Sequence, residues 1–434
     1  MDSTGTVAAP GHARPEAASG PVPLRRNLPF QTLWIGATAS TLGVSVADVA
    51  YPLTILAMTG SPARAGLFGA VQVIGMLVGG LPAGALADRY DRRTIVIAAE
   101  AARATVTAAV VVALVSGWLS LPVLLAAAAL LGIGQATRNA AGLPLVRSVV
   151  TPEQLTSALT QDEVRLNGAA LAGPAIGGAL YGVHALAHAL PFVFTAGSFL
   201  LALAAAALMT LVPGQTGPPP AGKPEDASSA APSGSMLAGL RTLWAQPVLR
   251  TATLLIMFMN TIGAGLELVI IVILRHQAVP SGTIGLALGA GAAGGLAGAP
   301  LVKTLHRLRP GVLLLAMGVL DVAVLALLAV PYGPWWVAGL LFTVMLGVPA
   351  IRVLGDILVI RQAPPEQRGR VIAALMTLIG LGMPVGLVGC GLLLQYLPAQ
   401  AAMLTLAAVE AAGVAYSSTR RELWRARWPA ETAS

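Results

Sequence analysis

The sequence predicts an all-α membrane protein with twelve transmembrane helices, and three observations support this fold class. Hydrophobic residues make up 56% of the 434 residues and charged residues only 10%, whereas an ordinary soluble domain carries about 25% charged residues. Aromatic residues reach only 5%, while a membrane β-barrel carries short alternating segments between aromatic girdles. Long apolar runs recur along the chain, and a spanning segment in lipid is expected to be helical because it must satisfy its own backbone polar groups.

The apolar runs form two groups of six, each run close to the roughly 20 residues that a crossing helix needs. The expected spans are 30–56, 65–86, 94–116, 121–146, 158–182 and 189–212, then 248–274, 283–304, 311–330, 335–360, 370–394 and 400–417. The sequence between the groups contains Pro218-Pro219-Pro220 and no apolar periodicity, which indicates a linker. The predicted organisation is a disordered cytoplasmic tail at 1–27, an N-terminal six-helix bundle at 28–212, a cytoplasmic linker at 213–240, a C-terminal six-helix bundle at 241–417 and a cytoplasmic tail at 418–434.

The positions of Lys and Arg predict the orientation. With a cytoplasmic N-terminus, almost all basic residues fall on inside segments, and the outside loops hold only Arg64 and Arg275 near their ends. This asymmetry follows the positive-inside rule and places both termini in the cytoplasm. It also explains the net charge of +8 without a nucleic-acid partner. The single cysteine, Cys390, lies in an apolar run, so neither a disulfide nor a thiolate metal site is expected.

The two halves resemble each other in sequence. The segment from Gly84 to Arg93 follows the second span, and a shift of 214 positions gives the segment from Gly298 to Arg307 after the eighth span. Glycine and the basic character persist, while Val302 stands where the first half has Asp88. Parallel six-helix repeats of this kind occur in a large class of transporters.

Two motifs carry a resemblance to a known family. Gly84, Asp88, Arg89, Arg92 and Arg93 resemble the loop signature between helices 2 and 3 of the major facilitator superfamily. The resemblance extends from about residue 28 to 416. It implies two six-helix bundles around a central cavity and transport by alternating access, and we expect a functional monomer.

A second motif points to one branch of this superfamily. Gly173, Pro174, Gly177 and Gly178 are similar to the helix-5 motif of drug–proton antiporters, although Ala169 stands where that motif has glycine. Local features such as Tyr51-Pro52-Leu53 resemble the branch that contains macrolide exporters and the enterobactin exporter, a siderophore exporter.

The resemblance also implies roles for the two motifs. Asp88 is expected to meet a helix N-terminus of the other half and hold the inner gate closed, where the helix dipole favours a carboxylate; a solvated turn that only fixes topology is the alternative. The Gly-Pro motif is expected to let helix 5 bend and approach a neighbour closely; packing by small residues is the alternative.

Ionisable residues inside the spans are candidates for proton coupling, because such residues are costly in lipid and are functional by default. Asp48 in the first span is the preferred candidate, followed by Glu267 in the seventh, with Glu163 and Asp356 as further possibilities. Asp321 and Glu410 are set aside, because helices 9 and 12 lie at the periphery of the fold that the resemblance implies.

The remaining polar residues of the spans are expected to pair with one another or face a cavity. Arg352 and Asp356 are spaced i, i+4 and are expected to neutralise each other, while Glu100 and Arg103 form an i, i+3 structural pair. Arg138 has no such partner on its own helix. The candidate cavity residues are Gln72, Gln135, Arg138, Asn139, Asn260 and Arg352.

Some patterns carry no function here. The run from Gly289 to Gly294 has dinucleotide-binding spacing but lies inside an apolar span, where helix packing explains it. His184 and His188 have no evident third metal ligand, and no phosphate-binding loop is present to support ATP drive. No metal or cofactor is therefore expected.

The function predicted from these patterns is proton-coupled efflux of a small amphiphilic organic compound, such as a drug, antibiotic or siderophore, across a bacterial inner membrane. The alternative is the same fold working as an uptake or lipid-translocating facilitator. An enzyme is not expected, because the acidic residues are scattered singly over different spans rather than clustered at one membrane face.

Overall fold

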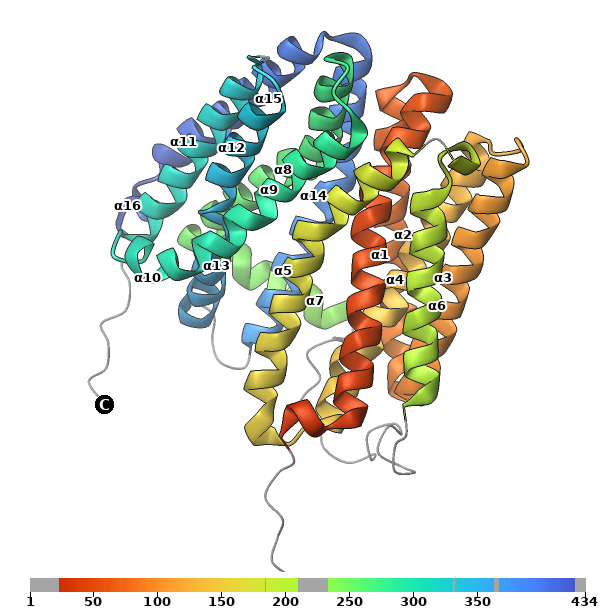
Figure 1. Ribbon diagram of the computed structural model, residues 1–434. Helices are drawn as coiled ribbons and strands as arrows, with labels where there is room; N and C mark the ends of the chain where they lie inside the picture. The colour runs from red at the N-terminus through yellow and green to blue at the C-terminus, as the bar shows by residue number, and fades with distance from the viewer. Residues whose placement is uncertain (1–22, 184, 210–232, 331, 363–366, 426–434) are drawn as a thin grey trace, which may run out of the picture.

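The computed structural model describes residues 23–183, 185–209, 233–330, 332–362 and 367–425, and within these ranges it contains helices and no strand. The N-terminal half holds α1 (Leu28–Thr59), α2 (Pro62–Arg89), α3 (Arg92–Val115), α4 (Leu121–Val149), α5 (Pro152–Gly182) and α6 (Leu190–Leu208). The C-terminal half holds α7 (Ser233–Ala245), α8 (Pro247–His276), α9 (Ser281–Gly298), α10 (Val302–Leu305), α11 (Pro310–Leu328), α12 (Pro334–Met345), α13 (Val348–Gln362), α14 (Arg368–Tyr396), α15 (Ala399–Ser418) and α16 (Arg421–Arg425). Figure 1 shows α1–α6 together in one bundle and α8, α9, α11, α12 and α15 in a second.

Side-chain caps fix where the first helices begin. Asn27 accepts a hydrogen bond from the Phe30 backbone N–H at 3.1 Å, and Asp91 accepts one from Thr94 N–H at 3.0 Å. Such caps satisfy donors that have no partner within the helix. Gly60, with φ of 64°, ends α1 in the left-handed conformation that glycine adopts without strain.

The prediction of an all-α fold with many membrane-spanning helices is confirmed. Eleven helical segments in the described ranges are long and apolar enough to cross a membrane. The twelfth segment is α5, whose 31 residues pack along α1 and α9 although its first half carries Asp162, Glu163 and Arg165. A count based on composition alone leaves α5 out.

The tenth span is not one continuous helix. We expected a single helix over 335–360, but the chain forms α12 and α13 with a turn at Leu346 and Gly347 between them. The physical reason lies in Pro349, which has no backbone N–H to donate to the Met345 carbonyl four residues earlier. Non-helical backbone at this depth is tolerated where it lines a cavity, and Met345 does line one.

Two segments predicted as linker and tail contain packed helix. Residues 233–240 of the predicted linker belong to α7, where a Cβ on Gly239 would overlap the Arg370 carbonyl of α14. The predicted C-terminal tail begins with the end of α15 and then forms α16, which buries Leu423 against the backbone of Gly311. Each segment therefore covers the inner end of the C-terminal bundle. The rest of the predicted linker, most of the N-terminal tail and residues 426–434 lie outside the described residues.

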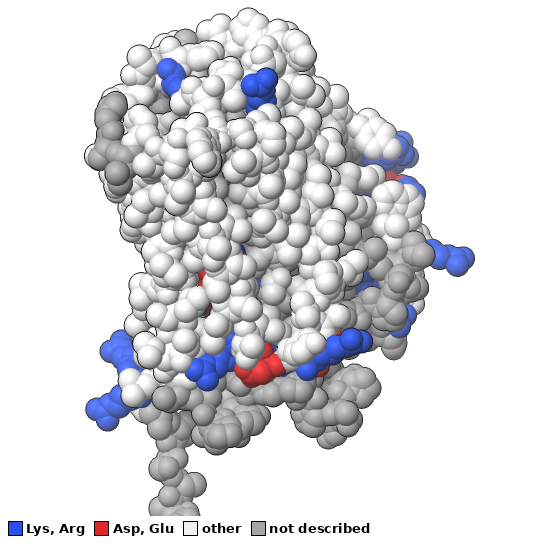
Figure 2. Space-filling view, turned by 90° about the vertical axis from the view of Figure 1, so that its right-hand side faces the viewer, with Lys and Arg blue, Asp and Glu red and all other residues white. Residues whose placement is uncertain are grey.

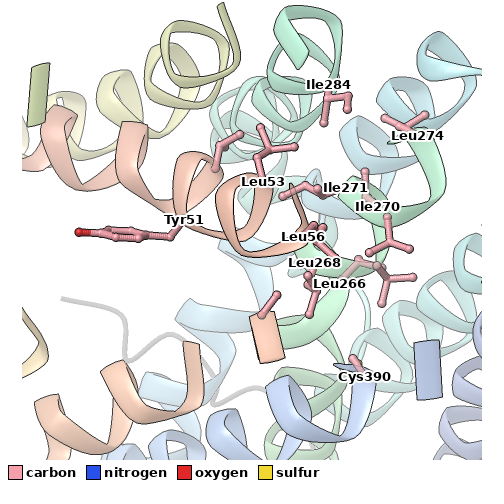
Figure 3. Packing of buried hydrophobic residues seen from close by; sticks show 14 of the residues in the cluster. Tyr51, Leu53, Leu56, Leu266, Leu268, Ile270, Ile271, Leu274, Ile284 and Cys390 are labelled. Atoms are coloured by element: carbon pink, nitrogen blue, oxygen red, sulfur yellow. The ribbon is translucent and has the colours of Figure 1, made fainter. Parts of the chain in front are cut away.

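The outer ends of the two bundles are packed tightly together. A single buried cluster combines Leu53 and Leu56 of α1 with Leu266, Ile270 and Ile284 of α8 and α9, and Figure 3 shows their side chains converging. A polar contact also crosses the seam here, because Arg275 donates a hydrogen bond to the Leu53 carbonyl at 3.0 Å.

Glycines allow the same close approach along two helix pairs, α2 with α14 and α5 with α9. A Cβ on Gly391 would lie 2.8 Å from the Pro62 carbonyl, and one on Gly289 would lie 2.7 Å from the Leu171 carbonyl. The Gly289 run predicted to serve helix packing does so in the structure. At Gly80, further toward the inner side, an added Cβ meets nothing within 4 Å. The bundles thus meet at the outer side and diverge toward the cytoplasm, which is an inward-facing arrangement.

The charged side chains follow the predicted orientation. Figure 2 shows Lys, Arg, Asp and Glu gathered toward one end of the molecule, a broad uncharged belt above them, and few basic side chains at the other end. A belt of this kind matches the hydrocarbon region of a bilayer.

Candidate functional site

A cavity of about 820 Å³ lies between the two bundles, a size suited to a small organic molecule. Its walls come from α1 and α5 of one half and from α8, α9, α12 and α13 of the other. Most lining residues are apolar or glycine. The polar and charged ones are Ser45, Asp48, Glu163, Asn167, Glu267 and Arg352.

Asp48 and Glu267 reach this cavity from opposite halves of the molecule. On α1, Val46 and Val49 are fully buried while Asp48 opens to the cavity, so the helix directs one polar side chain inward. On α8, Leu266 and Leu268 are buried on either side of the half-buried Glu267. Within the described residues neither carboxylate forms an ion pair or a hydrogen bond, so both are available to a proton or a ligand.

The helix-5 motif positions the part of α1 that carries Asp48. A Cβ on Gly173 would overlap the Ser45 side chain, and one on Gly177 would lie 2.6 Å from the Val46 carbonyl. The next glycine, Gly178, faces the other half, where an added Cβ would overlap the Ser281 carbonyl of α9. The motif therefore packs α5 against both halves at once.

Proline in this motif also lines the cavity. Pro174 is one of the cavity residues, and its carbonyl occupies the space that a Cβ on Gly285 of α9 would need. The structure keeps α5 helical through Pro174, from Pro152 to Gly182. A hinge role for this proline stays a prediction.

Glu163 and Arg352 form an ion pair across the cavity, with 3.8 Å between the Glu163 carboxylate and the Arg352 guanidinium. The sequence had paired Arg352 with Asp356 instead. The structure gives Arg352 a partner on α5, and the side chain of Asp356 lies outside the described residues.

The N-terminal bundle contains a buried charged network that sequence reasoning found only in part. Glu100 accepts from Arg103 at 3.1 Å, as the i, i+3 spacing predicted, and also pairs with Arg138 at 3.3 Å. Arg138 has no partner on its own helix, as predicted, and its partner lies on the neighbouring helix α3. Arg103 also donates to Ser40 of α1 at 2.9 Å and stacks on the ring of Phe199 at 3.9 Å.

This network borders a smaller pocket of about 370 Å³ within the same bundle. Gln135, Arg138 and Asn139 line that pocket and not the central cavity, and Gln135 donates to Asn139 at 2.9 Å. Arg165 pairs with Asp162 at 2.6 Å and donates to the Ala37 carbonyl of α1 at 2.9 Å. The contact between Arg165 and Ala37 ties α5 to α1.

The other candidate cavity residues do not line one common pocket. Asn260 lines a third pocket, of about 360 Å³, inside the C-terminal bundle, while Arg352 lines the central cavity. Gln72 lines none of these three pockets; its backbone carbonyl sits where a Cβ on Gly132 of α4 would be.

Two carboxylates that the sequence analysis set aside lie inside the C-terminal bundle. Asp321 of α11 lines the third pocket, and Glu410 of α15 is completely buried. A peripheral position of helices 9 and 12 does not by itself expose these residues, because both lie on the inward faces of their helices. The rule that ionisable residues within a span deserve a functional explanation would have kept both.

The gate motif lies at the inner ends of α2 and α3. Arg93 donates to the carbonyls of Ala206 and Ala207 and so caps the C-terminus of α6. Asp88 is exposed, and within the described residues its carboxylate forms no hydrogen bond or ion pair. An open inner side leaves the Asp88 carboxylate without the helix N-terminus that the family resemblance implies as its partner. As for the predicted histidine pair, His188 contacts the Tyr181 carbonyl at 2.7 Å, and His184 lies outside the described residues.

The comparison with known proteins agrees with this geometry. The sequence profile of the Major Facilitator Superfamily matches residues 33–387, so the chain belongs to this family. The chain is 28% identical over 383 residues to the multidrug efflux pump Tap of Mycobacterium tuberculosis and of Mycobacterium bovis, an alignment that covers 84% of this chain and 87% of the relative.

Solved transporters share the fold at lower identity. A bacterial homologue of the human lysosomal transporter Spinster, in an inward-facing and unoccupied conformation, superposes with a TM-score of 0.72 at 16% identity, covering 94% of this chain and 100% of that one. A bacterial homologue of the iron transporter ferroportin gives 0.68 at 20% identity, covering 92% and 98%. The protein is therefore a multi-pass membrane transporter and not an enzyme.

Proposed function

We propose that the protein is a proton-driven exporter of a small amphiphilic organic compound, acting by alternating access in a bacterial inner membrane. The observation that carries this proposal is the placement of Asp48 and Glu267, one from each half, in a single and mainly apolar cavity. No basic side chain pairs with either carboxylate in the described residues. The 28% identity to a multidrug efflux pump supports export as the direction and a drug-like compound as the cargo.

The mechanism needs only groups of this chain and two arrangements of the bundles. In the inward-facing arrangement the compound enters from the cytoplasm and binds with its apolar part against the cavity wall, while the carboxylates release their protons. The outward-facing arrangement exposes Asp48 and Glu267 to the outside, where protons replace the compound and return inward. The proton gradient supplies the energy, so this mechanism uses no cofactor and a single chain is sufficient.

The macrolide and siderophore branch stays part of the proposal. The cavity walls carry few hydrogen-bonding groups and are lined mainly by apolar side chains, which favours an amphiphile over a sugar, because a sugar site needs many polar contacts. A drug, an antibiotic and a siderophore all satisfy this requirement.

The test uses purified protein in liposomes loaded with ethidium, with a proton gradient of either sign. We expect an inward proton gradient to drive dye out through wild type, and Asp48→Asn to stop this uphill movement while still exchanging ethidium down its own gradient. Glu422→Gln, at an exposed carboxylate of α16, is the matched control and is expected to behave as wild type.

Other outcomes identify the alternatives. Uphill transport by Asp48→Asn would assign proton coupling to Glu267 instead. Glu267→Gln is then the corresponding test. Transport in the direction of the proton flow would favour the uptake reading. Movement of labelled lipid instead of dye would favour the lipid-translocating reading.

A further inference from the structure

The third pocket lies beside the central cavity. Gly263, Leu266 and Met345 line both, so the two spaces share a wall formed by α8 and α12. The pocket of about 360 Å³ extends from this wall into the C-terminal bundle. This side pocket is therefore a direct neighbour of the central cavity.

Four methionine side chains line the side pocket. Met259, Met317, Met345 and Met383 come from α8, α11, α12 and α14 and share its walls with Asn260 and Asp321. Thioether side chains are flexible and polarisable, so they adapt to ligands of varied shape and contact aromatic rings favourably.

The break in the tenth span helps to form these walls. A Cβ on Gly347 would overlap the sulfur of Met317, so the glycine at the turn between α12 and α13 leaves room for this methionine. The methionine wall thus depends on a local backbone feature and not only on composition.

Two carboxyl groups lie together at this pocket. Asp321 lines the pocket, and the carboxyl group of Glu410, its neighbour on α15 and 0% exposed, interacts with that of Asp321. No Lys or Arg of the described residues pairs with Asp321, Glu410 or the nearby Glu267. Two adjacent buried carboxyl groups can share one proton, and the negative charge that remains has no basic partner in the described residues, so this region favours a positively charged group.

We infer that the side pocket binds the apolar, aromatic part of an organic monocation and that Asp321 is its counter-ion. This inference rests on the proposed function and names the substrate class: lipophilic cations are preferred to neutral amphiphiles. Glu410 acts behind Asp321 as a positioning residue, because its buried carboxyl group interacts with that of Asp321 without lining the pocket. The methionines contact the aromatic body of the ligand, and the central cavity holds the remainder.

The test compares binding of two fluorescent probes to purified protein. Ethidium carries a fixed positive charge, and N-phenyl-1-naphthylamine is a neutral aromatic of similar character. We expect Asp321→Asn to weaken ethidium binding at least tenfold and to leave binding of the neutral probe within twofold. Asp321→Glu, which keeps the charge, is expected to restore ethidium binding, which shows that the asparagine variant fails through charge and not through misfolding.

A matched pair of variants tests the role of the methionine side chains. Met317→Ala is expected to weaken ethidium binding several-fold, whereas Met376→Ala, at an exposed methionine of α14 outside the pocket, is expected to leave it unchanged. Equal ethidium affinity in wild type and Asp321→Asn, or absence of ethidium binding to wild type, overturns the inference. Proton-driven export of the neutral probe, measured in liposomes, tests the proposed function separately, so either proposal can fail alone.

Discussion

Arg352 of α13 and Glu163 of α5 join the two halves of the transporter across the central cavity, with 3.8 Å between their charged groups. Among the described residues, theirs is the salt bridge that links one bundle to the other; the remaining three lie within the N-terminal bundle. Both side chains are exposed, at 74% and 53%. A pair this accessible can break and form as the bundles move.

The first prediction concerns this pair. An exposed ion pair contributes about 0–1 kcal/mol, so Arg352→Gln is expected to leave thermal stability in detergent nearly unchanged and to change the transport rate by less than about fivefold. The exchanged double variant, Glu163→Arg with Arg352→Glu, is expected to recover wild-type transport. A complete loss of transport in Arg352→Gln that the exchange does not rescue would show that Arg352 contacts the cargo instead.

The second prediction concerns the buried network at Glu100. This carboxylate is 1% exposed and pairs with both Arg103 and Arg138. Glu100→Gln leaves two arginines without their counter-ion, and breaking a buried pair costs about 3–5 kcal/mol. We expect a clear drop in the unfolding temperature and in the yield of folded protein. Glu153→Gln, at an exposed site in the first turn of α5, is the control and should change stability much less.

The third prediction concerns the outer seam, where α5 of the N-terminal bundle packs against α9 of the C-terminal bundle. Gly178 of α5 contacts the backbone of Ser281 in α9, and an added Cβ would overlap its carbonyl. Gly178→Ala is therefore expected to separate the outer ends of the bundles and favour the outward-facing arrangement. A cysteine introduced at Ile284, which is 1% exposed in this seam, reports the change through faster labelling by a membrane-impermeant maleimide in a Cys390→Ala background.

A second glycine of α5 provides the matched control for this experiment. A Cβ on Gly168 meets nothing within 4 Å, so Gly168→Ala should leave the labelling rate at Ile284 unchanged and favour the helix slightly. Equal labelling in the two glycine variants would contradict a role for Gly178 in closing the outer side.

The fourth prediction concerns the gate motif. Because Asp88 is exposed in this inward-facing arrangement, Asp88→Asn should not lower thermal stability here. Transport should nevertheless fall at least tenfold, because the closed inner gate is the state in which the carboxylate is expected to find its partner. Asp91→Asn in the same loop keeps an N-cap for α3, since asparagine caps as well as aspartate, and should transport normally. Normal transport in Asp88→Asn would leave the motif with a purely topological role.

Several features of the fold could be predicted because they depend on the chain locally. Apolar runs of sufficient length specify helices in lipid, and the positions of arginine specify the side of each loop. The break at Leu346 and Gly347 was missed because hydropathy is continuous through it. Only the missing N–H of Pro349, weighed against a cavity that the sequence does not reveal, indicates that the helix stops there.

The candidate site could be predicted only in part. Asp48 and Glu267 stood out as charges inside apolar spans, yet nothing in the sequence showed that they share one cavity. The pairing of Arg138 with Glu100 required the relative rotation of α3 and α4, which spacing within one helix does not contain. Asp321 was set aside for the same reason, since the face that a helix directs inward depends on how it packs.

Hydropathy and the positions of arginine were enough to specify a chain that crosses a membrane as two six-helix halves with its basic residues inside, because lipid penalises each exposed polar group where it stands in the chain. Tertiary structure decided which side is closed, where glycines bring α5 against α9 and α2 against α14. It also decided which charges meet, joining Glu163 to Arg352 and Glu100 to Arg138. These relationships join residues on different helices, so they follow from helix packing and not from the local pattern of any one segment.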